Sequence, residues 1–169
     1  MISLDIPTDY DGWRHQAKML WTASRPPEQV SWGEASLFDH GVGNSAEETT
    51  DVRVPAAFAK LAETAFMHSD LGRLDLLYRL FWRLQSNRHV LEDATDPDVV
   101  KAGLLVKAVR RDIHKMRAFV RFRETVDDHG VGQYLAWFEP DHDIVRANAG
   151  FFMRRFCSMR WSILTPKLC

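Results

Sequence analysis

Near the N-terminus, two short segments with a strand-like pattern of apolar and polar residues flank a segment with a helical pattern. Apolar and polar residues alternate over residues 2–6, which predicts a short strand that Pro7 ends. Thr8 or Asp9 can cap the following helix, whose apolar side chains recur at helical spacing to about Ser24. Arg25-Pro26-Pro27 ends this helix, and residues 29–32 predict a second short strand.

Three helices are predicted in the middle of the chain. Pro55 suits the first turn of a helix that runs to about residue 68. Residues 71–85 are apolar over most of a helical circumference, which predicts a helix at the centre of a core. Asp96 caps the third helix and Pro97 takes its first position. Its pattern continues to about Glu124, a length of roughly 40 Å.

The C-terminal part predicts a return to strands. Residues 133–139 are apolar on both faces, which is typical of a buried strand. A helix is expected from Ile144 to about Cys157, and a closing strand over residues 161–164. The sequence therefore predicts an α+β fold: a small mixed or antiparallel sheet backed by several helices, one of them long and basic.

The length of 169 residues predicts a single domain. Residues 39–51 are polar and contain almost nothing apolar, so we expect a flexible surface loop that joins subregions 1–38 and 52–169. The chain has no apolar run of about 18 residues, and an acidic residue, Asp5, lies where a signal peptide needs basic ones. We therefore expect a cytoplasmic protein without a membrane partner.

The net charge of −1 conceals an uneven distribution. Residues 1–50 carry a net charge of −5, and residues 101–169 carry +6. Eight lysines and arginines but one acidic residue, Asp112, lie between residues 101 and 123. A basic face on an otherwise acidic protein is typical of a polyanion-binding site. The alternative is a solvated helix face that pairs with the acidic N-terminal half.

Basic residues of the long helix form two adjacent rows at helical spacing. Arg110, His114, Arg117 and Arg121 lie within about 60° of one another. Each cation of such a surface can displace a counterion from a phosphate backbone. The candidate nucleic-acid-binding residues are Lys107, Arg110, Arg111, His114, Lys115, Arg117 and Arg121. His114 can bind phosphate, or it can be one more polar residue of the face.

Asp112 points to the apolar side of the same helix. A carboxylate there needs a hydrogen-bonded cation or must be neutral, and Arg154 or Arg155 is the expected partner. Glu139 and His142 lie where the predicted strand at 133–139 ends. These features allow an enzyme with a pocket formed by the candidate catalytic residues Asp112, His114, Glu139 and His142. The alternatives are a structural ion pair for Asp112 and, for the segment after the strand, a helix cap formed by Asp141 or Asp143.

The two cysteines do not have the spacing of a metal site, so neither a metal nor another cofactor is predicted. Cys157 lies in an aromatic-rich segment and is expected to be buried.

Several motifs resemble an uncharacterised bacterial domain. The helix Val109-Arg-Arg-Asp-Ile-His114-Lys-Met-Arg-Ala-Phe-Val-Arg-Phe122 is similar to its signature helix. Tyr134 to Pro140 with His142 is similar to its strand exit, and so are the later Phe152-Met-Arg-Arg-Phe156 and Trp161-Ser-Ile163. That domain is found alone or N-terminal to a uracil-DNA glycosylase-like domain, and beside a radical-SAM protein thought to act in DNA repair.

The resemblance implies an accessory role in DNA repair or DNA metabolism, with DNA and a glycosylase-like domain or a radical-SAM protein as partners. The glycosylase's catalytic motifs are absent from this sequence, so uracil excision is not expected of this chain. Two other hypotheses remain. One is the pocket enzyme described above, and the other is a docking module whose basic helix binds an acidic protein.

Overall fold

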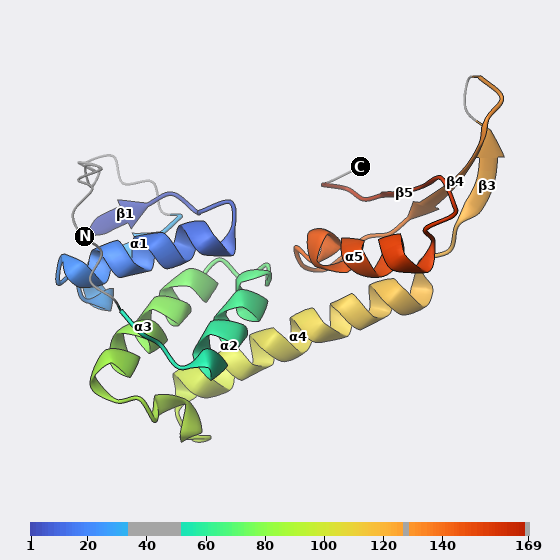
Figure 1. The fold of residues 1–169 in the computed structure, drawn as a ribbon. Helices are drawn as coiled ribbons and strands as arrows, with labels where there is room; N and C mark the ends of the chain where they lie inside the picture. The colour runs from blue at the N-terminus through green and yellow to red at the C-terminus, as the bar shows by residue number, and fades with distance from the viewer. Residues whose placement is uncertain (34–51, 127–128, 168–169) are drawn as a thin grey trace. The chain divides into compact units, whose positions relative to one another are not determined.

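The structure, a computed structural model, describes residues 1–33, 52–126 and 129–167 (Figure 1). Along the chain its elements are β1 (Ile2–Leu4), α1 (Tyr10–Thr22), η1 (Pro27–Gln29), β2 (Val30–Trp32), α2 (Ala56–Phe66), α3 (Arg73–Ser86), η2 (Val90–Glu92), α4 (Pro97–Phe119), β3 (Arg123–Val126), β4 (Gly132–Trp137), α5 (Val145–Arg155) and β5 (Trp161–Leu164). This is the predicted α+β class. The described helices include none that is long and apolar enough to span a membrane.

The chain divides into two compact units. Unit 1 contains Met1–Phe66 and Asp70–Val106, and unit 2 contains Met67–Ser69 and Lys107–Cys169. The division falls within α4. The predicted loop at 39–51 lies outside the described residues, and the prediction of one domain with two subregions stays a prediction.

The central helix of unit 1 is α3. Its apolar side chains are almost completely buried, as its nearly continuous apolar circumference predicts. The buried residues are Leu74, Leu76, Leu77, Tyr78, Leu80, Phe81 and Leu84. The hydroxyl of Tyr78 donates to the carbonyl of Arg25 at 2.6 Å, and burial raises the pKa of this phenol. Beside α3, the predicted segments at 2–6 and 29–32 form the strands β1 and β2, which pair in parallel.

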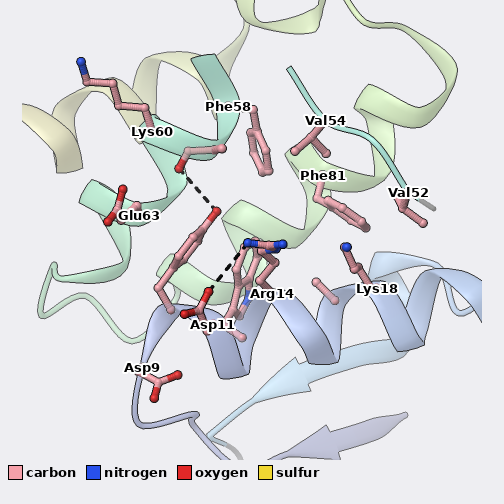
Figure 2. A pocket seen from close by; sticks show the side chains of 14 residues that line it. Asp9, Asp11, Arg14, Lys18, Val52, Val54, Phe58, Lys60, Glu63 and Phe81 are labelled. Atoms are coloured by element: carbon pink, nitrogen blue, oxygen red, sulfur yellow. Dashed lines mark hydrogen bonds and ion pairs between the residues drawn. The ribbon is translucent and has the colours of Figure 1, made fainter. Parts of the chain in front are cut away.

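Polar side chains fix the start of α1 and tie this helix to β2. Asp9 caps α1, because its carboxylate accepts from the backbone N–H of Gly12 at 2.8 Å. The indole N–H of Trp32 donates to Gln16 at 2.9 Å, so this buried tryptophan is satisfied. A cavity of about 730 Å³ lies in the same unit, lined by residues of α1, α2 and α3 (Figure 2).

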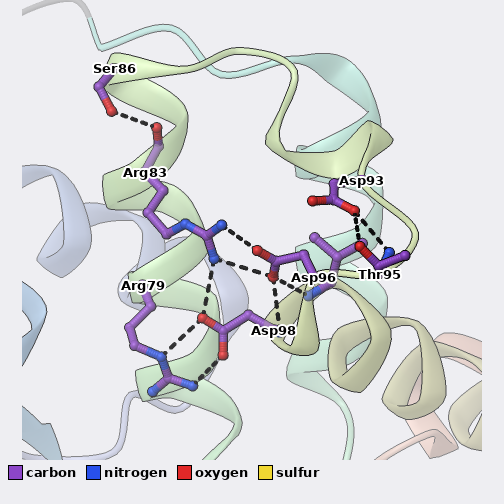
Figure 3. Close-up of polar contacts among 8 residues, drawn as sticks. Arg79, Arg83, Ser86, Asp93, Thr95, Asp96 and Asp98 are labelled. Atoms are coloured by element: carbon purple, nitrogen blue, oxygen red, sulfur yellow. Dashed lines mark hydrogen bonds and ion pairs between the residues drawn. The ribbon is translucent and has the colours of Figure 1, made fainter.

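An ion-pair network fixes the start of α4 (Figure 3). Asp96 accepts from the backbone N–H groups of Asp98 and Val99 at 3.0 and 3.1 Å, which confirms it as the cap. The guanidinium of Arg83 pairs with both Asp96 and Asp98. Arg79 binds the two carboxylate oxygens of Asp98 at 2.8 and 3.2 Å. The hydrogen bond from Arg83 lowers the pKa of Asp96 to about 2.

The prediction that α4 continues to Glu124 is wrong. The helix ends at Phe119, and Arg121 donates to the backbone carbonyls of Ala118 and Val120 at 2.7 and 3.0 Å. Residues 123–126 instead form β3, which pairs antiparallel with β4. The backbone groups of this segment are satisfied by the next strand, so hairpin pairing with β4 overrides the local helical pattern.

The sheet of unit 2 is mixed, because β4 pairs antiparallel with β3 and parallel with β5. The core beneath it combines α4, β4 and α5, and its buried residues are Val109, Met116, Val120, Ala136, Ile144 and Phe152. The prediction that β4 is buried on both faces is wrong. Ala136 is 4% exposed, but its neighbour Trp137 is 57% exposed. Successive strand residues point to opposite faces, and the core covers one of them.

The predicted burial of Cys157 is also wrong. The residue follows the C-terminal end of α5 at Arg155, and its side chain is exposed. The aromatic residues of this segment pack inward without it. Phe152 contacts Phe122 and Trp161, and Phe156 contacts Phe122.

Candidate nucleic-acid interface

The second half of α4 separates apolar and basic side chains as the sequence predicts. Val109, Met116 and Val120 are at most 8% exposed and belong to the core of unit 2. Of the seven predicted nucleic-acid-binding residues, Lys115 is half-buried and the others are exposed: Lys107, Arg110, Arg111, His114, Arg117 and Arg121. The basic face therefore points away from the core of its own unit.

Three of these seven side chains bind other parts of unit 2. Lys115 pairs with Asp141 at 3.1 Å. Arg117 donates from Nε to the buried amide oxygen of Asn148 at 2.7 Å, and its guanidinium carbon lies 4.9 Å from the ring centre of Phe151. Arg121 caps the C-terminal end of α4, as described above. These three cations stabilise the unit, and replacing them would perturb its fold as well as its charge.

The other four residues form what we call the open basic row: Lys107, Arg110, Arg111 and His114. Their spacing of i, i+3, i+4 and i+7 keeps them within an arc of about 100° on the helix. Within the part of the chain that the structure describes, none of the four makes an ion pair or a side-chain hydrogen bond. These cationic groups are thus available to a ligand.

Asp112 lies on the opposite side of α4 and is 2% exposed. Its carboxylate accepts from the backbone N–H of His142 at 3.0 Å. The prediction of Arg154 or Arg155 as its partner is wrong, since both arginines are exposed and neither contacts Asp112. A backbone donor replaces the expected cation because the segment before α5 lies against α4. Asp112 therefore ties this segment to the helix.

His142 belongs to a small polar cluster that the sequence did not suggest. Its Nδ1 accepts from the backbone N–H of Ser69 at 3.3 Å, and the Ser69 hydroxyl lies 3.1 Å from the same atom. The ring centre of His68 is 4.1 Å from that of His142. Residues 68 and 69 precede α3, more than 70 positions away in sequence. No local pattern could have found this cluster.

The four candidate catalytic residues do not form one cluster. Asp112 and His142 are joined by the backbone hydrogen bond, whereas Glu139 accepts from the indole N–H of Trp137 at 2.8 Å. His114 is exposed in the open basic row, and none of the contacts described for this part of the chain links it to the other three. The described residues also contain no group of three or more His, Cys, Asp or Glu side chains arranged to hold a metal ion. Catalytic roles for these residues stay a prediction.

Asn148 is a site residue that the sequence analysis missed. It is 0% exposed in α5; its Nδ2 donates to the sulfur of Met116 at 3.2 Å, and its oxygen accepts from Arg117. The available signal was a polar amide at a core position of an amphipathic helix, because such a group must find partners inside the protein.

Comparison with known proteins gives one match. Residues 72–168 match the family described as domain of unknown function DUF4130. This is more than half of the chain, and the chain therefore belongs to that family. No curated protein and no solved structure matches it. The matched residues include all of α4 and residues 107–168 of unit 2, and thus the open basic row.

Proposed function

We propose that this DUF4130 member binds DNA through the open basic row and acts as an accessory domain in DNA repair or DNA metabolism. The observation that supports the proposal is a set of three cations and a histidine on one helix arc, exposed and without protein partners in the described chain. The resemblance described in the sequence analysis supplies the biological setting, with a glycosylase-like domain or a radical-SAM protein as the proposed partner.

The geometry of the row suits a phosphate backbone. Lys107 and His114 are seven residues apart, or about 10 Å along the helix axis. Arg110 and Arg111 lie between them, and arginine can bind two phosphate oxygens at once. The opposite side of the helix is buried in the core, so α4 presents the row on a rigid element. No base-reading contact is required for this kind of binding, which depends mainly on charge.

Salt dependence tests the proposal. A fluorescein-labelled 20-base duplex and the corresponding single strand would be titrated with protein between 50 and 200 mM NaCl, with fluorescence anisotropy as the measurement. If Lys107, Arg110 and Arg111 each neutralise a phosphate, a plot of log affinity against log salt should have a slope of about −2 to −3. Affinity that does not change with salt would refute the proposal.

The alternative is that the open basic row docks an acidic protein. The same anisotropy assay distinguishes this function from DNA binding. An acidic peptide of ten glutamates would compete with DNA for the row. Competition at equal charge concentration, with no higher affinity for DNA, would favour an acidic protein as the natural partner. Weak competition would favour DNA, whose charge density is higher than that of the peptide.

A further inference from the structure

Two segments of unit 2 that are far apart in sequence lie against each other. One is the segment before α3, residues 67–69, and the other is the segment before α5, residues 141–143. The backbone N–H of Asp143 donates to the carbonyl of Met67 at 2.9 Å. Because both groups of this hydrogen bond belong to the backbone, neither of them titrates. A second contact between the same two segments depends on a side chain that does.

The second contact needs an unprotonated nitrogen in the ring of His142. A backbone N–H can only donate, so Nδ1 of His142 accepts from the N–H of Ser69 through its lone pair. Protonation of Nδ1 turns this acceptor into a donor and leaves two N–H groups facing each other. The hydroxyl of Ser69, 3.1 Å from the same nitrogen, can change from donor to acceptor, but the backbone N–H cannot. Protonation therefore removes the contact with the backbone of Ser69.

A second histidine makes a positive charge at this place more unfavourable. The ring centre of His68 lies 4.1 Å from that of His142, and the two ring planes differ by 31°. Neutral rings at this distance pack against each other, whereas two imidazolium rings repel. Histidine is the side chain that ordinarily changes its charge between pH 5 and pH 8. Acid therefore acts on the hydrogen bond and on the ring contact together.

The carboxylates around these histidines have other partners. Asp112 of α4 accepts from the backbone N–H of His142 and not from its ring. Three further carboxylates next to the two segments pair with lysines: Asp70 with Lys101, Asp141 with Lys115, and Asp143 with Lys167. Within the described residues none of these carboxylates forms an ion pair with the ring of His142. A positive charge on that ring thus gains no direct counterion.

We propose that His142 is a pH-sensitive switch that ties the segment before α3 to the segment before α5. At neutral pH the unprotonated Nδ1 holds the N–H of Ser69, and the ring of His68 packs against that of His142. In acid this N–H loses its acceptor and the two segments separate at Ser69, while Asp112 keeps the backbone of His142 on α4. The switch goes beyond the proposed DNA binding, because it uses none of the residues of the open basic row.

An NMR titration of the full chain from pH 8 to pH 5 tests the proposal. The amide proton of Ser69 should move upfield as its hydrogen bond is lost, with the same midpoint as the Cε1 proton of His142. The amide proton of Asn148 is the internal reference, because it donates to a backbone carbonyl within the same unit, and it should show no such transition. If the Ser69 amide does not move, or moves with a midpoint other than that of His142, the proposal is wrong.

Variants assign the switch to one ring. His142→Asn offers an amide oxygen that accepts from Ser69 at every pH, so the transition of the Ser69 amide should disappear. His15→Asn is the matched control, because it removes an exposed histidine of α1, and it should keep the transition. An unchanged transition in His142→Asn would overturn the proposal.

A third variant keeps the test valid even if His142→Asn does not fold. His68→Phe retains an aromatic ring beside His142 and removes the second titrating group. The Ser69 amide should still lose its hydrogen bond in acid, because Nδ1 of His142 is still protonated there. Loss of the transition in His68→Phe would assign the switch to His68 and contradict the role given to His142.

Discussion

The two compact units use their charged side chains in opposite ways. Unit 1 has ten basic and sixteen acidic residues, whereas unit 2 has twelve basic and seven acidic ones. In unit 1 Arg79 and Arg83 of α3 are held by carboxylates at the start of α4. In unit 2 the buried carboxylate of Asp112 binds a backbone N–H, and the cations of the open basic row have no protein partner in the described chain. Cations in excess of the available carboxylates remain free for an external anion.

The two units also differ in how much of each lies within the DUF4130 match. The DUF4130 match covers residues 72–106 of unit 1 and residues 107–168 of unit 2, and it excludes α1 and α2. The open basic row is therefore within the matched region, while all but one of the residues that line the cavity of unit 1 precede it.

Reversing charges in the open basic row should give the largest effect. The double variant Arg110→Glu/Arg111→Glu should weaken DNA binding at 50 mM NaCl by about a hundredfold or more, since each lost phosphate contact removes a counterion-release term. The thermal midpoint should not change, because neither side chain makes an ion pair or a hydrogen bond within the described residues. The measurement is fluorescence anisotropy, with circular dichroism for the midpoint.

The matched control for this variant is Arg146→Glu/Arg154→Glu. It makes the same change in net charge at two exposed arginines of α5 in the same unit. DNA binding in this control should fall far less than in the double variant of the row. Equal losses in the two variants would mean that net charge, rather than the row, determines binding.

The secondary structure could be predicted where the pattern is local. The cap at Asp96 and the central position of α3 follow from residue types and spacing, and both are confirmed. The end of α4 could not be predicted in this way. Val120, Phe122 and Val126 suit a helix and a strand equally well, and pairing with β4 decides between them. Exposure of Trp137 likewise depends on which sheet face the core covers.

The candidate site was predictable to a similar extent. Periodicity correctly separates the buried side of α4 from the exposed basic face. It does not distinguish free cations from those that bind Asp141, Asn148 or a helix terminus, because these partners come from other elements. The partner of Asp112 is a backbone group, which residue types do not reveal. The cavity of unit 1 likewise depends on how three helices pack.

Removing the buried carboxylate of unit 2 should give the next largest effect. Asp112→Ala leaves the N–H of His142 without its acceptor and should lower the free energy of unfolding by about 1–3 kcal/mol. Asp112→Asn is the matched control, because an amide oxygen can still accept this hydrogen bond, and it should lose less. Urea unfolding measures both variants. If Asp112→Ala keeps full stability but loses DNA binding, Asp112 has a functional rather than a structural role.

Because of its ion pairs, unit 1 should become less stable at low pH. The pKa of Asp96 is about 2 in the folded state and about 3.9 in unfolded chains. This carboxylate therefore stabilises the fold above about pH 4, and the stabilisation is lost as the pH falls toward 2. Arg83→Gln removes the main cause of the low pKa, so its urea midpoint should decrease less between pH 5 and pH 2.5 than that of the parent.

The control for this pH dependence is Arg88→Gln. Arg88 is an exposed arginine of the same unit that makes no side-chain contact in the described chain. This variant should keep the full decrease between pH 5 and pH 2.5. A parent-like decrease in Arg83→Gln would show that other groups control acid unfolding, and it would remove this contrast between the units.

The last prediction is that the protein by itself does not excise uracil from DNA. The sequence lacks the catalytic motifs of a uracil-DNA glycosylase, and the described structure does not join His114 or Glu139 to Asp112 and His142. Purified protein should therefore release no uracil from a uracil-containing duplex or single strand, measured by cleavage of the abasic product in alkali. Strand binding in the same samples, followed by anisotropy, would show that the substrate is engaged. Release of uracil that is lost in both His142→Ala and Asp112→Asn would contradict the accessory role. Unit 2 would then be an enzyme whose acid–base group is assembled by α4 and the segment before α5.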